Sequence, residues 1–259
     1  MNSFESFVIN LEKDRSRLGF MDKQLANLGI PYTRISGVLG SLLTEEDLQN
    51  VYDAQYINTH RLGQMSLGEI GCAASHKNAY TEFLASGAGY ALVLEDDVQL
   101  PEDFKAILEK QIAGQDTSGW EYLSFDYYAY GFPFLRLWIP GVISILKSKD
   151  GLISKIIFSA TIIVKLPFVL CASLYEEIQK LVCKDAPITP IRPIYFAGCY
   201  LITRAGAQKL LSVHDKILYI ADRLPNVARK QNNLNFKIYT PLVVTQLKET
   251  FASNLSSIK

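Results

Sequence analysis

The sequence has few cysteines, and they lie far apart along the chain. Cys72, Cys171, Cys183 and Cys199 are the four cysteines among 259 residues, and no CxxC pair occurs. A disulfide framework and a structural zinc site both need closer or more regular spacing. The sequence therefore predicts buried free thiols in a reducing compartment, which points to the cytoplasm.

The sequence also lacks an excess of charge of one sign. Its 26 acidic and 26 basic residues balance, and no basic block is interleaved with aromatic residues. Nucleic acid is therefore not an expected partner. The first residues, MNSFESFVINLEKD, show no basic stretch followed by an apolar one, so we expect no signal peptide.

One segment, residues 134–173, combines apolar and basic character. It is rich in Ile, Leu and Phe and carries five Lys or Arg residues against a single acid, Asp150. Lys155, Lys165 and Pro167 argue against a transmembrane helix, because a mid-helix Lys costs about 2.5–3.5 kcal/mol on insertion. The pattern favours a hydrophobic basic insertion that makes peripheral contact with an anionic membrane. An internal helical hairpin or a dimer contact are the alternatives.

Hydrophobic periodicity predicts alternating strands and helices along one domain, residues 1–247, followed by a polar tail, residues 248–259. This α/β order favours a mostly parallel central sheet flanked by helices, with ligands at the carboxyl ends of the strands. We expect strands at residues 4–11, 32–38, 90–98, 120–125, 195–203 and 236–245. We expect helices at residues 14–28, 66–86, 206–213 and from 101 onward.

An acidic triplet, Glu95, Asp96 and Asp97, ends the expected strand YALVLEDDV. In an extended chain Glu95 and Asp97 share one face and Asp96 points to the other. Such carboxylates suit one hard cation, Mn²⁺ or Mg²⁺, whose other ligands are water and the phosphates of a nucleotide. The alternative to a cation site is a solvent-exposed turn without a ligand.

Four ordered blocks extend this pattern. They are VINLEKDRSRLGFMDKQLANLGIPYTRISGV, LGEIGCAASHKNAY, YALVLEDDV and FAGCYLITRAGAQKLL. Together they resemble glycosyltransferase family 25, the bacterial lipooligosaccharide and lipopolysaccharide biosynthesis glycosyltransferases, which are β-galactosyltransferase-like. The resemblance runs from Val8 to about Gln246 and is weak between residues 127 and 193.

The resemblance implies a Rossmann-like glycosyltransferase fold of the A type and an inverting, metal-dependent reaction. Such an enzyme moves a hexose, typically galactose, from a UDP-sugar donor to a terminal sugar of a lipid-linked oligosaccharide acceptor. That acceptor implies a place on the inner face of the inner membrane. The resemblance also puts Glu95 and Asp97 in the places of the metal-binding Asp-x-Asp motif, and Asp96 on donor hydroxyls.

The remaining donor-site candidates come from the first two blocks. Asn10 and Leu11 end the first expected strand, where they can reach a uracil edge, and Arg15 and Arg17 can meet ribose or phosphate. In the second block a regular helix places Cys72 and His76 on one face, with Glu69 one turn earlier. We expect a hydrogen-bonding cluster that faces the sugar rather than a zinc site, because the ligand spacing is unusual for zinc. The donor-binding candidates from this block are Glu69, Ser75 and His76.

Sugar transfer with inversion also needs a general base for the acceptor hydroxyl. Asp126, at the end of an expected strand, and Asp222, which resembles a late acidic position of the family, are the candidates. The family often has Asp-His at that late position, whereas this chain has Asp222 followed by Arg223, which cannot ligate a metal. A catalytically inactive carbohydrate- or partner-binding module is the alternative function. A phosphoryl-transfer enzyme is disfavoured, because neither a phosphate-binding glycine loop nor a second carboxylate cluster is apparent.

Overall fold

The structure, a computed structural model, describes residues 4–60, 62–129, 175, 178–179, 182–191 and 193–247. The predicted insertion at 134–173 and the predicted tail at 248–259 lie outside these residues, as does Cys171. Of the three cysteines within them, Cys199 is buried, whereas Cys72 and Cys183 are only partly buried. Among the residues that the structure describes, no helix is both long and apolar enough to cross a membrane.

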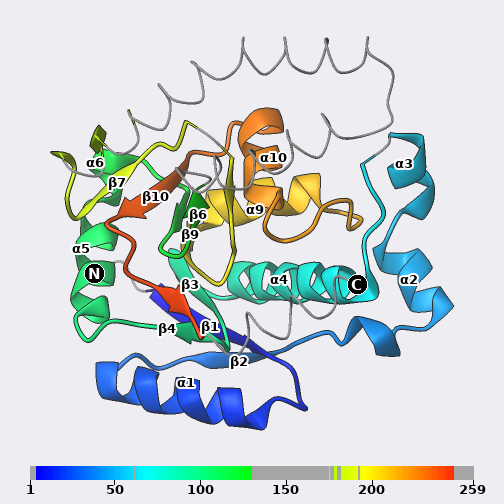
Figure 1. The fold of residues 1–259 in the computed structure, drawn as a ribbon, viewed down its shortest axis with the longest axis horizontal. Coiled ribbons are helices and arrows are strands. Elements are labelled where there is room, and N and C mark those ends of the chain that lie inside the picture. The colour runs from blue at the N-terminus through cyan, green and yellow to red at the C-terminus, as the bar shows by residue number, and fades with distance from the viewer. Residues whose placement is uncertain are drawn as a thin grey trace, which may run out of the picture.

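A seven-stranded mixed sheet forms the centre of the molecule (Figure 1). Its strand order is β2-β1-β3-β9-β5-β10-β7. The pairings give β2, β1, β3, β5 and β10 one direction, with β9 and β7 antiparallel to their neighbours. The prediction of a mostly parallel sheet is therefore confirmed. The strands are β1 (Phe4–Asn10), β2 (Thr33–Ser36), β3 (Tyr90–Glu95), β5 (Tyr122–Ser124), β7 (Ala186–Ile188), β9 (Cys199–Thr203) and β10 (Phe236–Thr240).

Two short ladders and several short helices complete the fold. β4 (Val98–Gln99) pairs with β11 (Thr245–Gln246), and β6 (Tyr128–Ala129) pairs with β8 (Ile194–Tyr195). The short helices are η1 (Gly40–Leu42), α2 (Glu45–Val51), α3 (Ala54–Thr59) and α6 (Gln115–Ser118).

Helices cover both faces of the sheet. α4 (Leu67–Ala85), α9 (Arg204–Val213) and α10 (Leu224–Gln231) pack on one face, and α1 (Arg15–Leu28) and α5 (Phe104–Ala113) pack on the other (Figure 1). The central strand β3 serves both layers, because its side chains alternate between them. Ala91 and Val93 join the α4 side, whereas Leu92 and Leu94 join the α1 side, and all four are fully buried. Each large aliphatic side chain buried in this way contributes about 1.5–3 kcal/mol.

The sequence sets the start of α4 through a capping box. The Ser66 hydroxyl accepts from the backbone N–H of Glu69, and the Glu69 carboxylate accepts from the backbone N–H of Ser66 at 2.7 Å. Two of the unpaired N–H groups of the first turn are thereby satisfied. This confirms the predicted helix start, and it fixes the end of α4 that approaches the acidic triplet.

Two glycines let α4 contact the loop before η1 through backbone alone. A Cβ at Gly40 would lie 1.7 Å from the carbonyl oxygen of Leu67, and one at Gly71 would lie 2.4 Å from the carbonyl oxygen of Val38. Gly71 therefore permits a backbone approach that a larger residue would block. At Gly68, by contrast, a Cβ would meet nothing nearer than the Ser66 hydroxyl at 4.0 Å.

This difference predicts opposite effects of alanine at two positions one turn apart. Gly71→Ala should lower the free energy of unfolding by about 1–3 kcal/mol, because backbone must move to admit the methyl group. Gly68→Ala should be neutral or stabilise by up to about 1 kcal/mol, since alanine is the better helix former. Urea unfolding of both variants measures this. Equal stability of the two variants would show that the loop and α4 do not touch.

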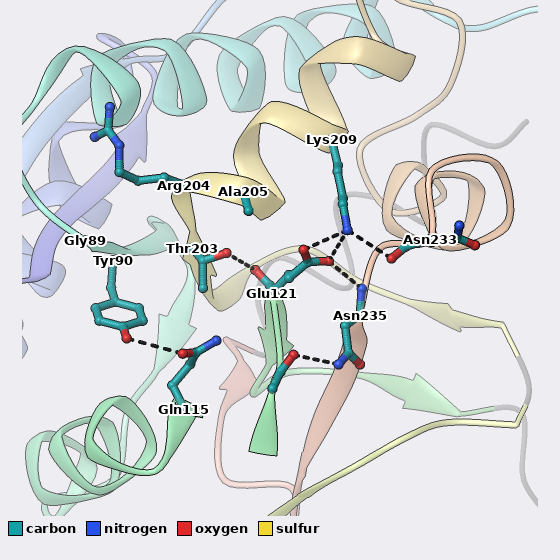
Figure 2. A pocket seen from close by; sticks show the side chains of 11 residues that line it. Gly89, Tyr90, Gln115, Glu121, Thr203, Arg204, Ala205, Lys209, Asn233 and Asn235 are labelled. Carbon is teal, nitrogen blue, oxygen red and sulfur yellow. Dashed lines mark hydrogen bonds and ion pairs between the residues drawn. The ribbon is translucent and has the colours of Figure 1, made fainter. Parts of the chain in front are cut away.

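A shallow cavity of about 590 Å³ lies at the edge of the sheet where β3, β5 and β10 begin (Figure 2). Its charged side chains are all paired within the protein. Lys209 Nζ contacts both Glu121 carboxylate oxygens at 2.7 Å, and the backbone N–H of Asn235 donates to Glu121 at 2.8 Å. Arg204 donates to backbone carbonyls at the end of α4, including that of Leu84 at 2.7 Å. We therefore interpret this cavity as a packing feature between secondary-structure elements rather than as a ligand site.

Candidate active site

A cleft of about 470 Å³ opens at the opposite edge, where β1, β2 and β3 end. This is the edge at which open α/β sheets bind their ligands. The acidic triplet forms its floor, the start of α4 forms one wall, and the loop after β2 forms another. The cleft is lined by Ile9, Leu11, Asp14, Arg17, residues 37–40, Gly68, Glu69, Cys72, Ser75, residues 95–97, Phe196, residues 220–222 and Gln246.

Glu95 points toward α4 and is held there by two side chains. His76 Nε2 lies 3.1 Å from Glu95 Oε1, and Cys72 Sγ donates to the same oxygen at 3.7 Å. The other ring nitrogen of His76 bonds the hydroxyl of buried Tyr200 at 2.8 Å. Burial acts to raise the pKa of Glu95, but the hydrogen bond and charge of His76 outweigh it, so the pKa lies below its ordinary value.

Asp96 points the other way and is engaged by the α1 side. It accepts from Asn10 Nδ2 at 2.6 Å and from Arg17 NH1 at 3.2 Å. Asn10 in turn accepts from Arg34 Nε at 3.0 Å, and it is only 1% exposed. Asn10 therefore acts as a bridge between Arg34 and Asp96, and its predicted contact with a nucleobase stays a prediction.

Asp97 is the least satisfied member of the triplet. It is buried, and its Oδ1 has no hydrogen-bond partner within the described chain. Burial and the charges of Glu95 and Asp96 raise its pKa to about 7. Because buried carboxylate oxygens normally have partners, an oxygen without one, beside two other carboxylates, indicates a place for a positive charge.

The prediction that the whole acidic triplet lies in an extended strand is wrong. β3 ends at Glu95, and Asp96 and Asp97 lie in the turn before β4. The period-two rule that placed Glu95 and Asp97 on one face holds only for extended backbone. All three nevertheless line the same cleft.

Asp222 reaches the cleft from the segment before α10. Burial, together with the charge of Glu95, raises its pKa to about 6, and the backbone N–H of Phe196 donates to it. Phe196 has a φ of 83°, a conformation that bulky residues rarely adopt. Strained backbone of this kind is often found at functional sites. Arg223, by contrast, is exposed and is not among the residues that line the cleft.

Asp126 lies beneath the cleft rather than in it. It is 3% exposed, and its two carboxylate oxygens accept from the backbone N–H groups of Gly198 and Cys199, each at 2.8 Å. Burial raises its pKa well above the ordinary value, against these two donors, which lower it. The carboxylate therefore ties β5 to the start of β9, and this geometry favours Asp222 over Asp126 as the base.

This contrast predicts that Asp126→Asn damages stability more than chemistry. An amide offers one oxygen and one N–H group to two backbone donors, so we expect a loss of about 1–3 kcal/mol in the free energy of unfolding. Transfer activity per folded molecule should change little. A variant with normal unfolding and no activity would instead assign the base to Asp126.

The cleft gathers some predicted donor-site residues and leaves others out. Ser75 lines it, although its hydroxyl accepts from Val38 N–H at 2.8 Å and donates to the Gly71 carbonyl at 2.7 Å. Arg15 instead pairs with Glu12 at 2.8 Å on the surface. The predicted residues that line the cleft are Leu11, Arg17, Glu69, Ser75, Asp96, Glu95, Asp97 and Asp222; those that do not are Asn10, Arg15, His76 and Asp126.

Three other parts of the cleft were not among the predicted site residues. They are residues 37–40 after β2, Phe196 before β9, and Gln246 on β11. Gln246 arrives there because β11 pairs with β4, and the backbone N–H of Leu247 donates to the Asp97 carbonyl at 2.8 Å. Glycines at 37 and 40 were the only hint of a tight loop.

Comparison with known proteins bears on most of the described residues. The model of the family described as "Glycosyltransferase family 25 (LPS biosynthesis protein)" matches residues 4–224. A "Glycosyltransferase 25 family member" of Aedes aegypti is 27% identical over 123 residues. "Procollagen galactosyltransferase 1-A" of Xenopus laevis is 26% identical over 121 residues. "Inactive glycosyltransferase 25 family member 3" of Homo sapiens is 29% identical over 125 residues.

These matches are partial on both sides. They cover 46% to 47% of this chain and 20% of each of the three relatives. The chain thus aligns with about a fifth of the length of the curated relatives it matches.

Proposed function

The chain belongs to glycosyltransferase family 25, and from this premise we propose that it transfers galactose from a UDP-sugar to a glycan acceptor, with inversion at the anomeric carbon. The observation that carries the proposal is the carboxylate-lined cleft, in which Asp97 Oδ1 has no hydrogen-bond partner among the described residues and Asp222 lines the same space. Galactose is supported by relatives named procollagen galactosyltransferases. A lipopolysaccharide-type acceptor is supported by the printed description of the family.

A divalent cation fits the floor of the cleft. Asp97 offers an unpartnered buried carboxylate oxygen, and Glu95 lies beside it, although its Oε1 is occupied by His76 and Cys72. Oxygen-only ligands of this kind suit Mn²⁺ or Mg²⁺. The cation would neutralise charge on a departing diphosphate.

The protein's own groups account for the rest of the reaction. Asp222, with a pKa near 6, takes the proton of the acceptor hydroxyl as that oxygen attacks the anomeric carbon. Arg17 is about one-third exposed in the cleft, and its bond to Asp96 orients its guanidinium for a phosphate. The backbone of residues 37–40 and Leu11 supply a wall for the nucleoside.

The direct test is a panel of UDP-sugars incubated with the chain, with Mn²⁺ or with EDTA. We expect cation-dependent consumption of UDP-galactose and, with a lipooligosaccharide acceptor, a β-linked product by NMR. Failure to consume any donor, with or without acceptor, would reject the transferase proposal.

A binding module without catalytic activity is the second candidate. It is favoured by a specific observation, because two of the relatives are named inactive or probably inactive members of the family. Binding of UDP and of glycan without turnover, measured by calorimetry, would support it over the transferase.

Contact with an anionic membrane through residues 134–173 remains a prediction from the sequence. Flotation of the chain with anionic and with neutral liposomes tests it, and equal recovery with both would remove the electrostatic component.

A further inference from the structure

Cys72, His76 and Glu95 bring three different ligand atoms together at one wall of the cleft. Cys72 Sγ, His76 Nε2 and a carboxylate oxygen of Glu95 all lie within 4.8 Å of one another. Glu95 Oε1 is 3.7 Å from the sulfur and 3.1 Å from the nitrogen. In a tetrahedral zinc site with ordinary bond lengths, neighbouring ligand atoms lie roughly 3.3–3.6 Å apart. The two distances from Glu95 Oε1 are therefore close to those between neighbouring zinc ligands.

The hydrogen bonds behind His76 aim its lone pair at the same point. The Tyr200 hydroxyl donates to the Tyr80 hydroxyl at 3.0 Å, which leaves Tyr200 to accept from Nδ1–H of His76 at 2.8 Å. Nε2 points at a Glu95 carboxylate oxygen, and when a cation replaces the proton between them, the lone pair of Nε2 faces that cation. Two acceptors at 3.1 Å need a proton or a cation between them. Metal-binding histidines are typically fixed in this way by a partner on the second ring nitrogen.

The three groups also have a route to solvent. Cys72 and Glu95 line the cleft, whereas His76 is buried behind them. An ion can enter from the cleft and leave its fourth position to water. Three protein ligands and one open position are a common arrangement for zinc.

From these observations we infer that Cys72, His76 and Glu95 form a binding site for a borderline-soft divalent cation such as Zn²⁺, distinct from the hard-cation site at Asp97. Sulfur and imidazole ligands favour zinc over manganese or magnesium. Cys72 binds as the thiolate, and its proton is released to solvent. Because Glu95 belongs to both sites, Zn²⁺ opposes the hard cation and inhibits transfer.

The binding itself is tested without any activity measurement. The EDTA-treated chain is titrated with Co²⁺, whose spectrum reports both tetrahedral geometry and a thiolate ligand. We expect a thiolate-to-cobalt absorption that Zn²⁺ abolishes and Mg²⁺ does not. Cys72→Ser should lose this absorption and weaken binding by about a hundredfold or more, whereas the matched control Cys183→Ser should keep both. A normal band in Cys72→Ser, or none in the unaltered chain, would overturn the site.

Thiol labelling gives a second readout that needs no variant. Zn²⁺ should slow alkylation of Cys72 by iodoacetamide, measured by peptide mass spectrometry, and leave the rate at Cys183 unchanged. Equal rates at Cys72 with and without Zn²⁺ would reject the site even if Cys72→Ser fails to fold.

The inhibitory effect rests on the proposed transferase and is tested separately. At saturating Mn²⁺, Zn²⁺ should inhibit the unaltered chain, and Cys72→Ser should be resistant. Cobalt binding at Cys72 without any transferase activity would retain the metal site and reject only the proposed function. Inhibition that persists in Cys72→Ser would place the inhibitory ion elsewhere.

Discussion

Asp97→Asn should abolish transfer while making the cation-free protein more stable. The amide removes the carboxylate proposed to hold Mn²⁺ or Mg²⁺, so we expect kcat to fall at least about a hundredfold. The stability gain has a different origin. Burial and the charges of Glu95 and Asp96 raise the pKa of Asp97 to about 7 from an ordinary value of 3.8. The folded chain therefore binds a proton more tightly than the unfolded chain does.

The sign of the stability effect follows from this difference. Between about pH 4 and pH 7 the folded state retains a proton that the unfolded state has lost, so the free energy of unfolding falls as the pH rises. At pH 8 in EDTA, Asp97→Asn should recover about 1–4 kcal/mol. Urea unfolding at pH 5 and pH 8 measures the change. Asp103→Asn, at an exposed acid nearby, serves as the control and should alter neither stability nor rate.

A variant that loses both stability and activity would contradict this account of Asp97. So would one that keeps full activity, because the proposed cation would then not need this carboxylate. Calorimetry with Mn²⁺ separates the two cases, since loss of binding with an intact fold is the expected result.

Asp222→Asn should lower kcat by about 10²–10⁴-fold with little effect on the KM for the donor. An amide cannot accept the proton of the acceptor hydroxyl, and general-base catalysis is worth about that much. Because the pKa of Asp222 is about 6, kcat/KM of the unaltered chain should fall about tenfold per pH unit below pH 6. The residual activity of the variant should lose this acid limb.

The control for Asp222 is Asp215→Asn, an exposed acid in the same connecting segment. It should keep both the rate and the pH profile. An acid limb that survives unchanged in Asp222→Asn would assign the titrating group elsewhere, even if the rate fell. Circular dichroism across the pH range excludes unfolding as the cause of the limb.

Sequence patterns predicted the local features of this fold because they depend on residues close in the chain. Ser66 and Glu69 form a capping box at the predicted start of the 66–86 helix, and Thr44 and Asp47 form another at the start of α2. α1 ends where expected, with Gly29 at a φ of 60°. In each case the interacting groups lie within about one helical turn, so local chemistry decides the outcome.

Contacts between distant residues were beyond the reach of these patterns. His76 bonds Glu95 on the neighbouring strand β3, whereas Glu69, one turn earlier on the helix, is used by the cap of its own helix. Asp96 is bound by Arg17, 79 positions earlier. Such pairs are set by how α1 and α4 pack on the sheet, and periodicity carries no information about that.

The direction of β9 was missed for a similar reason. Alternating strands and helices favour parallel neighbours, but β9 runs antiparallel between β3 and β5. Its reversed direction places Gly198 and Cys199 above Asp126, which converts a candidate base into an anchor. The direction of β9, more than the residue type, therefore explains why Asp126 is bound by backbone N–H groups and Asp222 is the better candidate for the general base.

Arg204 lies far from the cleft but affects the position of the helix that forms one of its walls. Its guanidinium donates to the carbonyls of Phe83, Leu84, Ser86 and Ala88, where α4 ends, on the side of the sheet away from the cleft. These bonds oppose movement of α4 along its axis, so Arg204 contributes to the position at which Cys72 and His76 meet Glu95. The position of the Cys72 and His76 side chains near one end of α4 thus depends in part on the Arg204 guanidinium, which binds backbone carbonyls at the other end.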